Sequence, residues 1–356
     1  MESRPVFGDD EWQYFETMLP QNLEASAREM RALVRCRNVP NALALLRMAL
    51  AYAVSDLSLK DVAAWAGSLG IAEITGPGLF YRVREAEVWL QRVLAQTLEK
   101  DVLGEPLRGL QMRIVDATVI NGPGAMGIEW RAHLIIDPVT GRFNAVQLTD
   151  DHIGEGFGRH PIKAGDLVLG DRMYATARGI YAVRQANAHV LVRLNPHTLR
   201  MCDMNQQRTS LLSETDRIPC VGSLEFSVLV PIPPERHTKS HRTWDIKDTI
   251  AWIPARVVAS RTRTGEVIWI LTTVPEVDLA PDIVLVLYRF RWQIELLFKR
   301  LKSLLHLDML PSREGPTAKS WMLARFLAAA LAQRMVEPSG ALSPWGYEIR
   351  QIRVHA

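Results

Sequence analysis

The run Asp166-Leu167-Val168-Leu169-Gly170-Asp171 is a short apolar segment enclosed by two aspartates. Its length and composition predict a buried strand that ends at Asp171. Residues 177–188 then have the pattern of a helix, and residues 189–194 form a second apolar segment of strand length. This alternation of strand, helix and strand is typical of an α/β protein.

Three further strands are predicted upstream, over residues 113–120, 131–137 and 142–149. The last two are joined by Asp137-Pro138-Val139-Thr140-Gly141, whose composition is that of a hairpin turn. Three antiparallel strands followed by alternating helices and strands are the order expected of a ribonuclease-H-like α/β core. We therefore expect Asp116 and Asp171 to lie at the ends of adjacent central strands.

The region before this core, from about residue 12 to residue 100, has apolar residues at helical spacing and no strand pattern. A short helix is predicted over 58–66, a turn-rich break over 67–78, and a second helix over 79–84. This order predicts a helix-turn-helix unit for DNA recognition, although most such segments are plain packing units. The candidate DNA contacts on the second helix are Tyr81, Arg82 and Arg84.

Between residues 198 and 280 the helix pattern disappears, and strands are predicted over 224–230, 255–259 and 267–273. A basic loop over 235–242 is a candidate DNA contact or a solvated loop. The expected organisation is a helical domain with the candidate DNA-recognition unit (1–105), the first part of the core (106–197), an inserted β-rich subdomain (198–280), the second part of the core (281–336) and a tail (337–356).

Composition narrows the class of protein. The chain has 356 residues, and 42 Lys and Arg against 39 Asp and Glu leave a net charge of only +3, so a nucleic-acid surface has to come from local clusters of cations. Cys36, Cys202 and Cys220 are far apart, which argues against a zinc site or a disulfide framework. No signal peptide or membrane-spanning run is apparent, and a cytoplasmic location is expected.

Near the C-terminus, residues 288–302 read YRFRWQIELLFKRLK. At about 100° per residue in a helix, Tyr288, Arg291, Lys299 and Lys302 all fall close to Glu295 on one stripe. One carboxylate among cations suits a metal ligand flanked by phosphate-binding side chains. Taken alone, the stripe is better explained as a solvated face with ordinary ion pairs one turn apart.

The spacing of these residues favours a functional site over a solvated helix face. Y-x2-R-x3-E-x6-K resembles the signature of bacterial insertion-sequence transposases of the DDE type, in the branch called insertion sequence family four. The resemblance extends to the Asp116 strand, to residues 149–155 and to residues 170–174. Met173 departs from it, because relatives often have glycine there. Members of this family bind the terminal inverted repeats of their element, excise it and join its 3′ ends to target DNA.

The resemblance implies that Asp116, Asp171 and Glu295 are the catalytic and metal-binding residues, with two Mg²⁺ ions as cofactors and Mn²⁺ as a substitute. Few carboxylates, with room left for water and phosphate, suit such hard cations. Judged singly, Asp171 is as well explained as a helix cap and Asp116 as a strand end. Together with Glu295 in its cationic setting, they favour a catalytic site.

The family template further implies DNA contacts by Tyr288, Arg291 and Lys302, with Lys299 on the same stripe. Trp269 resembles a tryptophan on which hairpin-forming relatives stack a flipped base. A tryptophan buried in its strand is the alternative.

The expected partner is double-stranded DNA, both element ends and target, bound by a homodimer that assembles on it. Two alternatives stay open: an end-binding protein that has lost catalysis, and a metal-dependent nuclease that cleaves without joining.

Overall fold

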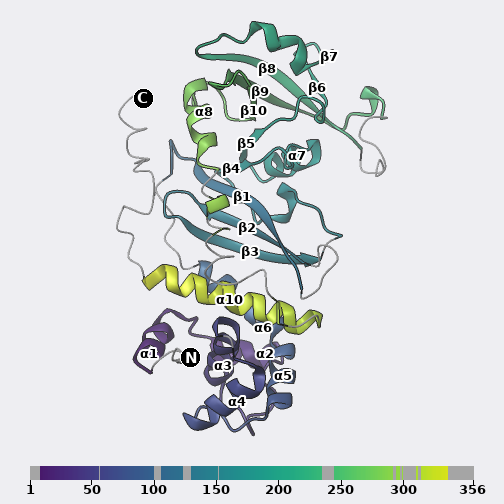
Figure 1. Cartoon of the computed structure of the whole chain (residues 1–356). Helices are drawn as coiled ribbons and strands as arrows, with labels where there is room; N and C mark the ends of the chain where they lie inside the picture. The colour runs from purple at the N-terminus through teal and green to yellow at the C-terminus, as the bar shows by residue number, and fades with distance from the viewer. Residues whose placement is uncertain are drawn as a thin grey trace.

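The computed structural model describes residues 9–55, 57–99, 106–122, 130–150, 152–234, 244–291, 294–296, 299, 310, 311 and 314–335. Figure 1 shows three parts stacked along the long axis: N-terminal helices, a central sheet, and a β-rich end. Within the described residues, no helix is both long enough and apolar enough to cross a membrane.

The N-terminal part is helical, as predicted. It contains α1 (Asp9–Met18), α2 (Leu23–Glu29), α3 (Ala42–Val54), α4 (Leu59–Ser68), α5 (Gly76–Glu85) and α6 (Glu87–Glu99). Local sequence sets where these helices begin. Ser58 and Asp61 form a capping box at α4, and the Thr75 side chain accepts a hydrogen bond from the Gly78 N–H at the start of α5. The predicted second helix thus begins a few residues earlier than expected.

α10 (Gly315–Met335), from the other end of the chain, lies between these helices and the sheet (Figure 1). It packs on α3, α5 and α6 on one side and on β3 (Arg142–Asp150) on the other. Residues 320–331 are all buried, as expected for a helix covered on every side. Phe326 meets Phe143 of β3 edge-on, with ring centroids 6.1 Å apart. The N-terminal helices therefore share one hydrophobic core with α10 and the sheet.

The described strands form one ten-stranded sheet, in the order β3-β2-β1-β4-β5-β10-β9-β8-β6-β7. The bounds of the other nine strands are β1 Gln111–Ile120, β2 Trp130–Asp137, β4 Asp166–Gly170, β5 His189–Arg193, β6 Met201–Cys202, β7 Arg208–Thr209, β8 Ser223–Ile232, β9 Ala251–Arg261 and β10 Val267–Thr272. β4 is parallel to β1 and β5, whereas the other pairs are antiparallel. The strands predicted from sequence are confirmed. β10 joins β5 directly, so the predicted insert continues the central sheet without a break.

The sheet has two covered faces. One face carries Ile114, Leu134 and Leu169 and packs on α10 and on α8 (Pro281–Arg289). The opposite face carries Val115, Ile135 and Val168. It packs on α7 (Ala177–Gln185) and on η1 (Phe157–Arg159), a turn of 3₁₀ helix.

The structure differs from one sequence-based expectation and favours one of two alternatives. Asp116 does not end its strand, because β1 continues to Ile120 through its antiparallel pairing with β2. For Trp269 the structure favours the alternative of a tryptophan buried in its strand. Its side chain is only 3% exposed, packed in the core of the α7 face, because alternation along β10 turns it inward.

We predict that Trp269→Ala destabilises the protein by about 3–5 kcal/mol, the usual cost of emptying a buried tryptophan site. Denaturant unfolding measures this loss. Trp252→Ala on the neighbouring strand β9 is the matched control, because Trp252 is only partly buried and should cost less. An unchanged stability for Trp269→Ala would contradict its core role and return it to consideration as a base-stacking residue.

Candidate active site

The two predicted aspartates lie side by side. β1 and β4 are parallel and pair Gln111 with Asp166 and Ile114 with Leu169. Two residues further along both strands, this register places Asp116 level with Asp171. Asp171 is the first residue after β4. Asp116 lies beyond the last residue of β1 that pairs with β4, in the part of β1 that pairs with β2 alone. Both carboxylates are therefore at the point where the parallel pairing ends.

The turn after β4 holds Asp171 in place. A Cβ at Gly170 would lie 2.8 Å from the Tyr174 Cβ and 2.9 Å from the Phe157 ring, so no larger residue fits there without movement. Beyond it, the Met173 N–H donates to Asp171 Oδ1 at 2.7 Å. Met173 is 61% exposed and is not among the residues with positive φ, so this turn does not need the glycine of the family pattern.

Glu295 and Asp116 are connected through Arg291. Arg291 Nη2 donates to Glu295 Oε1 at 2.5 Å, and Arg291 Nη1 lies 3.9 Å from Asp116 Oδ2. The Arg291 guanidinium also lies over the Tyr288 ring, 6.0 Å from its centroid. The four residues thus meet on one face of the sheet, the face that Asp116 shares with Ile114 by strand alternation.

The helix predicted over 288–302 is interrupted. α8 ends at Arg289, Arg291 lies in a turn, and the chain is helical again at 294–296 and at 299. The ion pair between Arg291 and Glu295, foreseen as the plain alternative, is present. Lys299 is exposed. Lys302 and the basic loop over 235–242 lie outside the described residues.

The candidate DNA contacts on α5 lie apart from the carboxylates, beyond α10 (Figure 1). Tyr81 and Arg84 are exposed, although Arg84 Nε lies 3.4 Å from Glu314 Oε1. Arg82 has a structural contact, since its Nη2 donates to the Arg35 carbonyl at 2.9 Å. Of the three residues, Tyr81 is therefore the one on α5 without a described polar contact.

Sequence reasoning missed Glu155 and Arg131. Arg131 lies on β2, its Nη1 donates to the Ile153 carbonyl at 2.6 Å, and its Nε lies 3.8 Å from Glu155 Oε1. Burial raises the pKa of Glu155, and the negative charge of Asp171 raises it further. Glu155 belongs to the segment 149–155, which matched the family pattern; that match was the one available signal.

Negative charge accumulates at this site. Burial raises the pKa of Asp116 to about 7, and the charges of Asp171 and Glu155 act in the same direction, against the Ala117 N–H and Arg291. Such mutual repulsion between partly buried carboxylates is relieved by a cation. Oxygen donors of this kind suit a hard divalent ion.

The carboxylates are not arranged as a finished metal site. Within the described ranges, no three His, Cys, Asp or Glu residues are placed to hold one ion together. Asp116, Asp171 and Glu295 therefore do not form one ligand group among the described residues, and the Glu295 carboxylate accepts a hydrogen bond from Arg291. The donor chemistry of these carboxylates fits a divalent cation.

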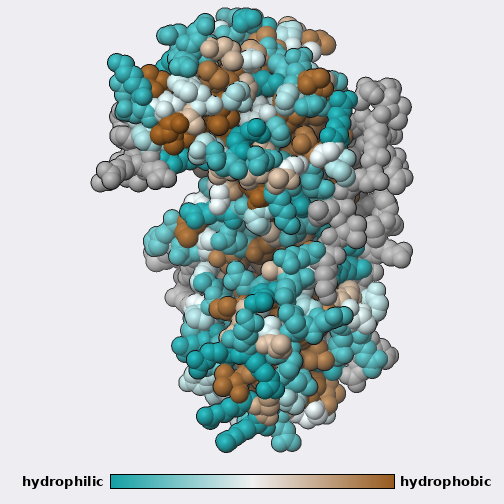
Figure 2. All heavy atoms as spheres, turned by 180° about the vertical axis from the view of Figure 1, so that it is seen from behind, coloured by the Kyte–Doolittle hydropathy of each residue, from teal (hydrophilic) through white to brown (hydrophobic). Residues whose placement is uncertain are grey.

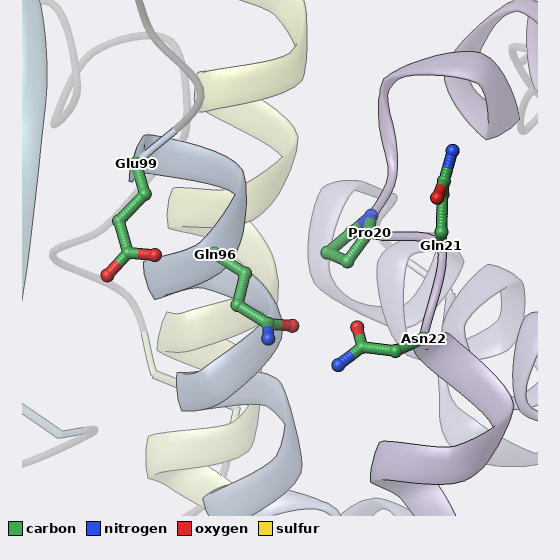
Figure 3. Close-up of a pocket in the computed structure, with 5 residues that line it drawn as sticks. All are labelled: Pro20, Gln21, Asn22, Gln96 and Glu99. Atoms are coloured by element: carbon green, nitrogen blue, oxygen red, sulfur yellow. The ribbon is translucent and has the colours of Figure 1, made fainter.

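Two surface features do not compete with this site. A pocket lined by Pro20, Gln21, Asn22, Gln96 and Glu99 lies between α6 and the turn before α2 (Figure 3). It gathers none of the predicted residues and has a single carboxylate. On the face seen in Figure 2, described hydrophobic residues are scattered among hydrophilic ones, which is ordinary for a protein surface.

Comparisons with known proteins agree with this reading. Residues 108–331 match the family described as the transposase DDE domain. InsL of Escherichia coli K12, described as a transposase for insertion sequence element IS186A, is 33% identical over 343 residues, covering 90% of this chain and 92% of that protein. The transposase for element IS421 of Escherichia coli is 33% identical over 344 residues, with the same coverage.

Among solved structures, the cryo-EM structure of the piggyBac transposase synaptic complex with hairpin DNA aligns with a TM-score of 0.45 and 9% identity, covering 96% of this chain and 83% of that one. The family match and the identity to full-length relatives settle the classification: the chain belongs to the DDE transposases of bacterial insertion sequences.

Proposed function

We propose that this transposase binds the terminal inverted repeats of its element and catalyses metal-dependent DNA cleavage and strand transfer, with Asp116, Asp171 and Glu295 as the catalytic carboxylates. The observation that carries the proposal is the register of β1 and β4, which sets Asp116 level with Asp171 on the side where Arg291 connects to Glu295. Three antiparallel strands followed by the parallel β4-α7-β5 unit support a ribonuclease-H-like core.

Proteins with this domain use divalent metal ions. Asp116, Asp171 and Glu295 would hold two Mg²⁺ ions, with Mn²⁺ as a substitute. Bound there, the ions would activate the attacking oxygen and stabilise the leaving 3′ oxygen. Arg291 then has two roles. Without DNA its guanidinium neutralises Glu295 and lies near Asp116, and on DNA binding it moves to a phosphate, which frees both carboxylates.

Recognition of the element ends is assigned to the N-terminal helices, since a catalytic core that contacts phosphates cannot select one sequence. α5 presents Tyr81 and Arg84 at the surface. Because α10 completes the core of these helices, end binding has to be tested in the full chain rather than in a fragment that stops near residue 100. A homodimer on DNA completes the proposal.

We predict that Asp116→Asn, Asp171→Asn and Glu295→Gln each abolish cleavage of a duplex carrying an element end. Binding should persist or strengthen, because one repulsion of phosphate is removed. Gel-based cleavage and binding assays measure both. Glu29→Gln is the control, since Glu29 is an exposed carboxylate on α2 that pairs with Arg92 of α6, away from the site. Wild-type cleavage by Glu295→Gln would show that the trio is misassigned.

The Arg291 prediction concerns binding. Arg291→Ala should weaken DNA affinity and reduce the salt dependence by about one ion, as expected when one phosphate contact is lost. Affinity measured over a series of salt concentrations tests this. Arg217→Ala removes the same charge from an exposed ion pair with Glu214 and should leave the slope unchanged. Equal slopes for wild type and Arg291→Ala would restrict Arg291 to a structural role.

Cation binding has a readout that is independent of cleavage. Adding Mn²⁺ or Mg²⁺ should raise the thermal midpoint of the wild type. At a cation concentration one hundred times the dissociation constant, the free energy of unfolding should increase by about 2.7 kcal/mol. Asp116→Asn should lose most of that gain. Calorimetry measures the shift, and an equal gain in both proteins would place the ion elsewhere.

These experiments also separate the alternatives. Bound ends without cleavage by the wild type would favour an end-binding protein. Cleavage without joined products would favour a nuclease.

A further inference from the structure

Three buried ring side chains lie behind the carboxylates: Tyr174, His160 and His133, which we call the buried polar cluster. The His160 ring centroid is 5.9 Å from that of Tyr174 and 6.1 Å from that of His133. Their exposed fractions are 0%, 8% and 1%. His133 follows Arg131 on the same face of β2, and this face is opposite to the one that carries Leu134 and α10.

Each ring has a polar atom without a partner. Tyr174 Oη, His160 Nε2 and His133 Nδ1 are buried and make no hydrogen bond within the part of the chain that the structure describes. The other nitrogen of His133, Nε2, lies 2.8 Å from Thr149 Oγ1. Burying three such atoms in neighbouring residues destabilises the fold unless they share a hydrogen-bond partner. Buried polar side-chain atoms with no protein partner are usually bonded to ordered water, and three of them on neighbouring rings offer one water the several partners that it needs.

The cluster is in the right protonation state for such a role. Burial lowers the pKa of His133 to about 4 and that of His160 to about 3, so both rings are neutral near pH 7 and each has one donor and one acceptor. Burial, followed by the charges of Asp116, Glu155 and Asp171, raises the pKa of Tyr174 above its usual range. Tyr174 therefore keeps its proton and remains a donor beside three carboxylates.

Backbone and side-chain contacts join the cluster to the site. The Tyr174 N–H donates to the Asp171 carbonyl at 3.2 Å, so any displacement of the Tyr174 ring acts on the Asp171 turn. Tyr174 also packs on Phe157, with centroids 5.2 Å apart, two residues beyond Glu155. Arg131 contacts the same segment through Ile153 and Glu155.

We propose that Tyr174 is a positioning residue of the transposase: its hydroxyl, hydrated together with His160 and His133, holds Asp171 and Glu155 in the geometry that accepts divalent cations. The inference rests on the proposed function and adds to it a support on the opposite face of the sheet from Arg291. Glu155 enters as a fourth carboxylate, held by Arg131 and Tyr174.

Removing the Tyr174 hydroxyl tests the proposal through the sign of the stability change. A buried hydroxyl with no hydrogen-bond partner destabilises the folded protein, so its removal would raise the thermal midpoint. A hydroxyl that bonds water and carboxylate supports its surroundings, so its removal lowers the midpoint. The full-length protein with Tyr174→Phe should melt lower than wild type. Tyr52→Phe, which removes the hydroxyl of a tyrosine on α3 whose residue is 7% exposed and packs in the other core, is the matched control.

The metal readout separates positioning from simple folding. With Mn²⁺ as the probe, the concentration that gives half of the thermal stabilisation should rise about tenfold or more in Tyr174→Phe, as for other residues that orient metal ligands. Half-maximal cleavage should shift to higher Mn²⁺ in parallel. Tyr52→Phe should leave both concentrations unchanged.

A double variant tests whether the cluster acts as one unit. His160→Phe keeps a ring against Tyr174 and removes both nitrogens. If the two residues share water, the combined variant should lower the midpoint by no more than the larger single change. A raised midpoint for Tyr174→Phe with unchanged Mn²⁺ dependence would overturn the proposal, as would strictly additive losses. Absence of cleavage by the wild type would instead count against the proposed function, and the melting experiments would still decide the role of Tyr174.

Discussion

The parallel pairing of β1 with β4 is the constraint on which the site depends. It brings Asp116 and Asp171, from distant parts of the sequence, to the same level in the sheet. The pairing ends just before these two residues, so neither of them is engaged in it. The close fit of Gly170 against Tyr174 and Phe157 fixes the turn that follows. Arg291 brings Glu295 to the same place from a different segment, and it does so by charge rather than by strand register.

Local patterns were sufficient for most of the fold. Apolar runs and turn residues located β1 to β5 and β8 to β10 within a few residues, because each strand has its own β-branched or alternating pattern. Asp116 was expected at the end of its strand, but the predicted range 113–120 already places it inside, and β1 does end at Ile120. The burial of Trp269 depends on which face of β10 the core covers.

For the site, sequence supplied the carboxylates but not their surroundings. Asp116, Asp171, Arg291 and Glu295 were named from spacing and family likeness, and the structure brings Arg291 to both Asp116 and Glu295. Arg131 had no local signal of function, and Glu155 had only its place in the segment 149–155 that matches the family pattern, because their contact is a property of the folded sheet. The same holds for Tyr174, His160 and His133, which are ordinary core residues until their unpaired polar atoms are considered together.

The position of α10 has a consequence for how the protein is made. Its apolar surface fills the space between the N-terminal helices and the sheet, yet it is synthesised after every other described helix and strand. Until α10 has been made, the surfaces of α3, α5 and α6 that contact it stay exposed to solvent. Exposed apolar surface of this kind is bound by chaperones and makes a chain susceptible to proteases. A chain truncated before α10 would thus be a short-lived fragment rather than a stable protein, and defective gene copies would leave little product in the cell.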